Sequence, residues 1–172
     1  QAARAELSNL NGQQHAQVLL DLVKAFARVP YHVLVREAKR LGYNLAILRL
    51  SIATYRLGRV VRVEGVLAAI QTPTRGIVAG SVFATAELKL LMIRIVDQAC
   101  FLHESIVPTL YVDDTSAEAT GEPANILAEL PPFVLYVCTE LAADGMEVSL
   151  TNGQSTASSD TLGHDLAAAL EG

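Results

Sequence analysis

Residues 106–115 read Ile-Val-Pro-Thr-Leu-Tyr-Val-Asp-Asp-Thr, an apolar stretch that ends in two adjacent carboxylates. The apolar run predicts a strand from Ile106 to Val112, and the run 113–115 predicts the turn that ends it. A second apolar run, Gln17 to Val23, is also expected to form a buried strand, and it holds Asp21 in its interior. The sequence therefore places one carboxylate in a predicted strand and two at the end of another.

A carboxylate on a buried strand calls for a physical explanation. Burying the charge costs several kcal/mol unless it is paired or holds a metal ion. Taken singly, each acidic site has an ordinary structural explanation, because Asp often caps a helix and Asp-Asp is common in turns. Taken together, Asp21 and Asp113-Asp114 give two strand ends that could converge, as an oxygen-loving Mg²⁺ ion requires.

The rest of the chain alternates between helical periodicity and short β patterns. Helices are expected over 24–42, 44–57, 81–98, 125–144 and 162–170, with a break at the proline pair 131–132 in the fourth. A hairpin is expected from 59 to 71 around Glu64-Gly65, followed by a loop over 72–80. A last strand is expected over 146–150 and a Gly/Ser/Thr-rich loop over 152–160. One α/β-type domain follows from this pattern.

The net charge of −5 hides a strong asymmetry along the chain. Residues 1–94 carry all 13 Lys and Arg residues and only 5 of the 18 acidic residues, whereas residues 95–172 carry the other 13 acidic residues. Such a division suits a protein in which one surface attracts phosphate and another gathers carboxylates. Mutual neutralisation of the two halves across an interface explains the same numbers equally well.

Composition excludes two broad classes. With 172 residues and 51% hydrophobic against 18% charged, the chain can bury a sizeable core and is not of the disordered class. Uncharged stretches such as 76–86 are shorter than the roughly 20 residues of a spanning helix, so no membrane is expected as a partner. Without an apolar run in residues 1–10, and with Cys100 and Cys138 as free thiols, an intracellular (nuclear or cytoplasmic) location is expected.

Four blocks in this order resemble the motifs of reverse transcriptases, especially those of non-LTR retrotransposons and group II introns. The run from Leu20 to Pro30 resembles the first palm motif, and Tyr111 to Asp114 is similar to the Tyr-x-Asp-Asp box. Between them, Arg75 to Ser81 resembles the Gly-x-x-Gln-Gly-Ser loop, and Leu141 to Ser155 resembles the fourth motif. A single four-residue match is weak, but ordered blocks over about residues 15–160 are specific.

The resemblance implies an α+β polymerase palm, an antiparallel sheet packed against helices on one face, with part of the fingers. It implies RNA-templated DNA synthesis from deoxynucleoside triphosphates onto a DNA primer, with two Mg²⁺ ions (or Mn²⁺) in phosphoryl transfer. It assigns catalysis and metal binding to Asp21, Asp113 and Asp114. It assigns nucleotide and template contacts, by the same matching, to Phe26, Arg75, Gly76, Gly80, Ser81 and Tyr111, with Phe26 as a gate against the ribose 2′-hydroxyl.

The sequence also departs from the family pattern at supporting positions. Ala27 stands where an Asp is usual, Ala79 where the loop has Gln, and Gln154 where the fourth motif has Lys. Gln cannot act as a general acid, a role worth on the order of 10²–10⁴ in rate. Since neither complete fingers nor a thumb is recognised, residues 1–172 are expected to form a single partial reverse transcriptase domain. Two alternatives stay open: a catalytically dead palm-derived module that binds nucleic acid or protein, and another phosphoryl-transfer enzyme such as a nucleotidyl cyclase.

Overall fold

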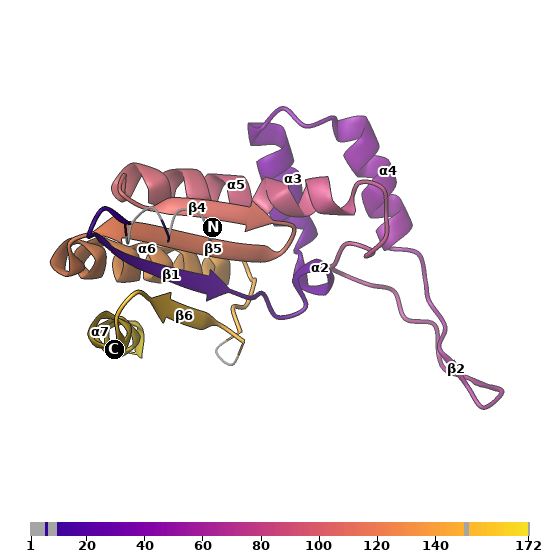
Figure 1. Cartoon of the computed structure of the whole chain (residues 1–172). Helices are drawn as coiled ribbons and strands as arrows, with labels where there is room; N and C mark the ends of the chain where they lie inside the picture. Colours follow the sequence, from indigo (N-terminus) through magenta and orange to yellow (C-terminus); the bar gives the residue numbers. More distant parts are fainter. Residues whose placement is uncertain (1–5, 7–9, 150–151, 172) are drawn as a thin grey trace. The chain divides into compact units, whose positions relative to one another are not determined.

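The computed structural model describes residues 6, 10–149 and 152–171. The named strands are β1 (Gln14–Leu20), β2 (Arg62–Val63), β3 (Val66–Leu67), β4 (Val107–Tyr111), β5 (Asp114–Gly121) and β6 (Gln154–Ala157). The named helices are α2 (Ala25–Arg28), α3 (Tyr31–Arg40), α4 (Leu45–Tyr55), α5 (Ala84–Leu102), α6 (Pro123–Ala143) and α7 (Asp160–Glu171) (Figure 1).

The chain separates into two units. Unit 1 comprises Gln1–Val23, Ile95–Ala143 and Glu147–Gly172, and unit 2 comprises Lys24–Arg94 and Asp144–Met146. Helix α5 begins in unit 2 and ends in unit 1. Each unit has buried side chains of its own, and the single partial reverse transcriptase domain stays a prediction.

Unit 1 is built on an antiparallel sheet in the order β4-β5-β1-β6. Alternate residues of β1, Ala16, Val18 and Leu20, are buried, as expected for side chains that face the core of a sheet. Helix α6 packs against β5 and β1, and α7 lies against β6 and α6 (Figure 1). The predicted antiparallel sheet packed against helices is confirmed.

Strand β5 was not predicted, and its pairing explains why. The turn expected at 113–115 is instead centred on Val112 and Asp113, and the chain continues directly into β5. Its sequence, Asp-Thr-Ser-Ala-Glu-Ala-Thr-Gly, has few of the β-branched and aromatic residues that mark strands. Pairing with β4 on one side and β1 on the other imposes the extended form, and small residues such as Ala117 and Ala119 fit under α6.

Helix α6 runs through Pro131 and Pro132, so the predicted break is wrong. Each interior proline removes one helical hydrogen bond at a cost of about 3 kcal/mol. Burial offsets that cost, because the flanking residues Leu130 and Phe133 are both fully buried.

By length and composition alone α6 is also long and apolar enough to cross a bilayer. A core helix meets the same two criteria, and α6 buries one side against β1 and β5. The expectation that no membrane is involved therefore stays a prediction.

The last strand of the sheet lies later in the chain than predicted. Within the expected strand 146–150, Val148 makes only an isolated bridge to Leu22, and Leu150 lies outside the described residues. The paired strand is β6, inside the stretch predicted to be a loop. Gln154 to Ala157 are polar or small residues with weak β preference, and pairing with residues 16–19 of β1 supplies their hydrogen bonds.

Unit 2 begins with two helices where one was predicted over 24–42. Helix α2 ends before Val29, because Pro30 disfavours helical geometry in the residue that precedes it. Helix α3 then begins directly after Pro30. Asn44 caps α4 through its side chain, which accepts hydrogen bonds from the N–H groups of Ala46 and Ile47. The predicted hairpin is confirmed by β2, β3 and the outer Arg59–Gln71 bridge.

A buried ion-pair cluster stabilises unit 2. Arg36 donates to Glu37 at 2.7 Å and to Asp144 at 2.8 Å, Arg40 donates to Glu37 at 2.8 Å, and Arg94 donates to Asp144 at 3.0 Å. Burial alone raises the pKa of the Glu37 carboxyl, but hydrogen bonds from Arg40 and Arg36 outweigh it and lower that pKa. Both carboxylates of the cluster are therefore compensated charges, with 1% and 6% of their side chains exposed.

Candidate functional site

Asp21 lies at the end of β1, beside the beginning of β5. The last paired residues of these strands are Leu20 and Thr115, so Asp21 and Asp114 are the next residues in register. The backbone carbonyl of Asp21 accepts a 2.7 Å hydrogen bond from the N–H of Ser149, which fixes the chain where it leaves the sheet. The predicted convergence of two strand ends is thus present in the backbone.

The β4–β5 turn that carries Asp113 is strained at the preceding residue, Val112. Tyr111 and Asp114 close the hairpin, and Val112, between them, has a φ of +58°. A β-branched residue at positive φ costs on the order of 1–3 kcal/mol and is a genuine outlier. Such strain is found in functional turns, and here it holds the half-buried Asp113 beside the end of the sheet.

Asn152 joins this site, and sequence reasoning did not select it. Its side-chain amide donates a 2.8 Å hydrogen bond to Oδ2 of Asp21, and its backbone N–H donates to the Ser149 hydroxyl at 3.1 Å. The available signal was an Asn-Gly pair at the loop of the fourth motif, two residues before Gln154. Gln154 itself pairs with Leu19 of β1, two residues before Asp21.

The chemistry of the donors suits a hard divalent cation, since carboxylate oxygens are its preferred ligands. Within residues 6, 10–149 and 152–171, however, no three or more His, Cys, Asp or Glu side chains form a group that could hold a metal ion. The same end of the sheet therefore carries Asp21, Asp113 and Asp114, but these carboxylates do not form an assembled metal centre. Tyr111, at the end of β4, is 73% exposed beside them.

The remaining predicted site residues belong to unit 2, where Phe26 and Gly76 are neighbours. The carbonyl of Phe26 accepts a 2.7 Å hydrogen bond from the N–H of Ile77, and the N–H of Gly76 donates to the Val29 carbonyl at 2.8 Å. Gly76 has a φ of +97°, and a Cβ on it would lie 2.8 Å from the carbonyl oxygen of Ala27. A glycine is therefore needed here for contact with α2, whatever else the loop binds.

Arg75 extends from the same loop into solvent. It borders a shallow hollow of about 470 Å³ shared with Tyr31, His32 and Gly145. Since phosphate contacts need an accessible guanidinium, the position is compatible with the predicted contact to nucleic acid.

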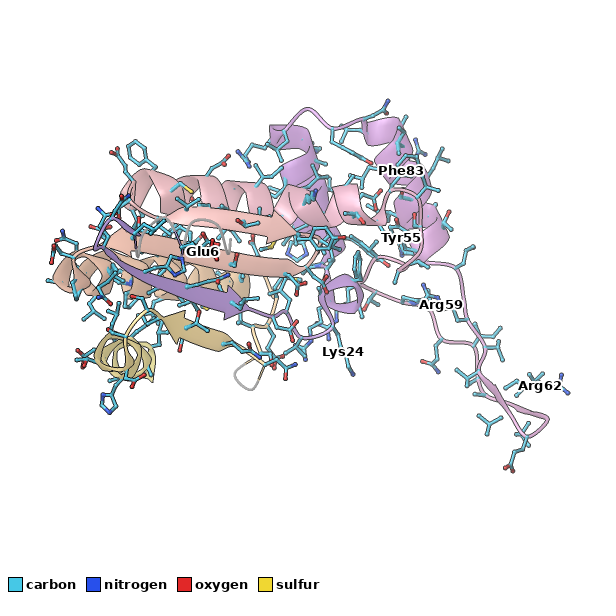
Figure 2. The ribbon with its side chains drawn as sticks, viewed as in Figure 1. Glu6, Lys24, Tyr55, Arg59, Arg62 and Phe83 are labelled. Carbon is cyan, nitrogen blue, oxygen red and sulfur yellow. The ribbon has the colours of Figure 1, made fainter. Side chains whose placement is uncertain are left out.

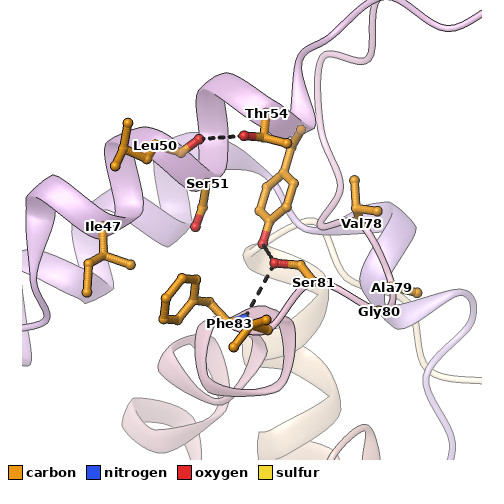
Figure 3. Close-up of a pocket in the computed structure, with 11 residues that line it drawn as sticks. Ile47, Leu50, Ser51, Thr54, Val78, Ala79, Gly80, Ser81 and Phe83 are labelled. Atoms are coloured by element: carbon orange, nitrogen blue, oxygen red, sulfur yellow. Dashed lines mark hydrogen bonds between the residues drawn. The ribbon is translucent and has the colours of Figure 1, made fainter.

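Gly80 and Ser81 line a pocket of about 610 Å³ between α4 and the loop that precedes α5 (Figure 3). The Ser81 hydroxyl is hydrogen-bonded to the Tyr55 hydroxyl at 3.0 Å and accepts from the Phe83 N–H at 3.4 Å. The Tyr55 hydroxyl also donates at 2.8 Å to Glu87, whose carboxylate is fully buried. Burial is the main reason that the pKa of Tyr55 is raised, so its hydroxyl stays protonated as a donor.

The predicted site residues thus fall into two sets. The carboxylates and Tyr111 gather at one end of the sheet in unit 1, and Phe26, Arg75, Gly76, Gly80 and Ser81 belong to unit 2. In the second set, Phe26, Gly76 and Ser81 form hydrogen bonds with other residues of unit 2.

No protein-family model matches the chain, and no curated protein matches it in sequence. Solved structures share its fold, among them two telomerases. A telomerase from Candida albicans, in complex with the TWJ fragment of telomeric RNA, has a TM-score of 0.67 at 14% identity and covers 94% of this chain. Apo telomerase from Candida tropicalis, truncated from its C-terminal domain, has a TM-score of 0.64 at 13% identity and covers 91%.

The chain spans about a third of the length of these two telomerases, 30% and 33% respectively. The likeness shows that the fold is reverse-transcriptase-like, in agreement with the motif order of the sequence. At such low identity it carries no statement about activity.

Proposed function

We propose that this chain is the palm region of a reverse transcriptase of the non-LTR retrotransposon or group II intron type. RNA-templated addition of deoxynucleotides to a DNA primer is the proposed reaction. The observation that carries the proposal is the register of β1 and β5 in a reverse-transcriptase-like fold, which puts Asp21 next to Asp114 and the strained turn that bears Asp113.

The proposed residue roles follow the motifs. Asp21 and Asp113, with Asp114 beside them, would hold the divalent ions, Mg²⁺ or Mn²⁺, which neutralise the triphosphate and the leaving pyrophosphate. Phe26 is proposed as the gate against a ribose 2′-hydroxyl. Contacts to the nucleotide and the template are proposed for this residue and for Arg75, Gly76, Gly80, Ser81 and Tyr111. The Asn152 amide orients the Asp21 carboxylate through Oδ2 and leaves its other oxygen for a cation.

Binding of Mn²⁺ in the presence of a deoxynucleoside triphosphate tests the proposal directly. The parent chain is compared with Asp21→Asn, and with Asp165→Asn on the exposed side of α7 as a matched control. We expect saturable Mn²⁺ binding, read by electron paramagnetic resonance, in the parent and the control but not in Asp21→Asn. In any form of the protein that extends primers, Asp113→Asn should abolish extension and leave the fold unchanged. Equal extension by mutant and parent would exclude Asp113.

A second candidate function is a palm-derived module that binds nucleic acid without turnover. The lack of an assembled carboxylate group among the described residues, and Gln154 in place of a general acid, favour it. In that case neither parent nor variant binds Mn²⁺, whereas an RNA–DNA duplex still binds, with an affinity that falls as salt rises.

A further inference from the structure

The β2–β3 hairpin carries a series of large aliphatic side chains that are exposed to solvent. We call residues 56–71 the arm (Figure 2). Its large aliphatic side chains are between 46% and 72% exposed: Leu57, Val60, Val61, Val63, Val66, Leu67 and Ile70. Val60 and Val61, which are neighbours in the chain, are 46% and 60% exposed, so neither side chain is covered.

A surface of this kind indicates a partner. A two-stranded hairpin is at best marginally stable alone, and contiguous exposed apolar surface marks a site of association. The arm nevertheless has a defined ladder: Arg59 and Gln71 exchange two hydrogen bonds of 2.8 and 2.9 Å, and the N–H of Ala68 donates to Val61 at 2.9 Å. It is therefore a formed element with uncovered sides.

The charges on the arm indicate an acidic partner. Arg56, Arg59 and Arg62 are exposed, and no described carboxylate forms an ion pair with them, while Glu64 is the arm's single acidic residue. Residues 56–71 contain no aromatic side chain, so the arm lacks the stacking surface with which proteins bind single-stranded nucleic acid. Aliphatic side chains gain nothing against a phosphate backbone, and they favour a protein partner.

This chain itself carries a surface of the required chemistry. We call Asp97, Phe101, Leu102, Glu104 and Val107 the α5-end patch. Asp97 and Phe101 are four residues apart on α5 and share one face of the helix, and a four-residue connection joins its end to β4. Phe101, Leu102 and Val107 are 79%, 56% and 40% exposed. In the described part of the chain, Asp97 and Glu104 form no ion pair, and residues 95–172 contain no Lys or Arg.

We infer that the arm docks on the α5-end patch of a second copy of this chain. Apolar surface meets apolar surface, and arginines of one copy that form no ion pair meet carboxylates of the other that form none. Reciprocal exchange of arms gives a closed two-fold dimer that uses both surfaces once in each copy. The inference does not depend on catalysis or on the proposed function.

Charge reversal on the two surfaces, singly and mixed, tests the dimer. Sedimentation velocity is run on the parent chain over about 1–100 µM, the usual range of weak association. The arm variant is Arg59→Glu/Arg62→Glu, and the patch variant is Asp97→Lys/Glu104→Lys. Each variant alone sets like charges against each other and should weaken dimerisation at least about tenfold, whereas an equimolar mixture restores attraction at both contacts and should restore the dimer.

Two further measurements separate a loss of docking from a loss of folding. Far-UV circular dichroism and urea unfolding establish that both variants fold, and Val61→Thr/Val66→Thr removes apolar surface while keeping β-forming residues, so it should also weaken the dimer. A parent chain that is monomeric over the whole range overturns the inference. So does a mixture that stays monomeric. A monomer whose arm variant alone loses affinity for an RNA–DNA duplex assigns the arm to nucleic acid and overturns it too.

Discussion

Unit 1 and unit 2 both bury apolar side chains, but unit 2 also holds the buried ion-pair cluster. In unit 1 an antiparallel sheet and α6 bury apolar side chains, with Leu130 and Phe133 fully enclosed. In unit 2, arginines neutralise two of the buried carboxylates, Glu37 and Asp144. Stability from apolar burial depends little on pH and is lost when volume is removed, whereas stability from paired charges is lost when one partner is removed or titrated.

The same contrast appears in charge. Unit 2 holds every Lys and Arg except Arg4, and unit 1 holds every acidic residue except Glu37, Glu64, Glu87 and Asp144. The carboxylates proposed for catalysis therefore lie in the acidic unit, and the arm in the basic one. The two units can be perturbed separately, and the variants below are ordered from the largest expected effect to the smallest.

Phe133→Ala should produce the largest loss. The ring is fully buried in α6, and truncation leaves a cavity, which costs about 3–5 kcal/mol in the free energy of unfolding. Leu135→Ala, on the same helix but 46% exposed, is the matched control and should cost well under half as much. Urea unfolding followed by circular dichroism gives both values. Equal losses would show that α6 is not the core helix of unit 1.

Glu37→Ala should destabilise unit 2 by about 3 kcal/mol, because it leaves Arg36 and Arg40 without their buried partner. Glu37→Gln keeps the volume and removes the charge, so a similar loss would assign the effect to electrostatics. Lys39→Ala on the exposed side of α3 serves as control and should change stability by less than about 0.5 kcal/mol. The same urea titration reports all three.

Gly76→Ala and Gly80→Ala form a pair that separates backbone strain from steric contact. Both residues have positive φ, +97° and +93°, but only at Gly76 does a Cβ meet another atom, the Ala27 carbonyl oxygen at 2.8 Å. We expect about 1 kcal/mol for Gly80→Ala and about 2 kcal/mol more for Gly76→Ala. Thermal unfolding midpoints rank the two. Equal shifts would mean that the loop does not rest on α2.

Acidification should weaken the protein through unit 2. The Glu37 carboxyl has a pKa below its ordinary value of 4.5 when folded, so the unfolded chain binds the proton more readily. The stabilisation is fully present above pH 4.5 and is lost as pH falls through the lower, folded pKa. Urea unfolding of the parent and of Glu37→Gln over this range should show a steeper decline in the parent. Parallel declines would assign the acid sensitivity to other carboxylates.

The smallest expected effect is on the arm. Val61 is 60% exposed, and Val61→Thr keeps a β-branched side chain, so it should change the stability of the monomer by less than about 0.5 kcal/mol. Unfolding at a protein concentration too low for association isolates this value. A loss comparable to that of Phe133→Ala would mean that the arm is part of a core.

Sequence patterns predicted the elements whose signals are local. The hairpin around Glu64-Gly65, the helix expected over 44–57 and the strand expected over 106–112 follow from turn chemistry and short-range periodicity. The patterns failed at β5, at β6 and at Pro131-Pro132. In each case the structure depends on partners far away in the chain, namely the neighbouring strands or the surface against which α6 packs.

The same distinction between local signals and distant partners applies to the candidate site. The sequence alone singled out Asp21, Asp113 and Asp114 as candidates, because carboxylates next to apolar runs call for an explanation. It also determined the reverse-transcriptase-like motif order and the division of charge. Only the tertiary structure decided that Asp21 and Asp114 are adjacent in register, that Asn152 bonds Asp21, and that Gly76 packs on α2. The hydrogen bond from Asn152 to Asp21 joins residues 131 positions apart in the chain, so it leaves no local pattern in the sequence. The pairing of strands is likewise set by the whole chain and not by the residues that meet.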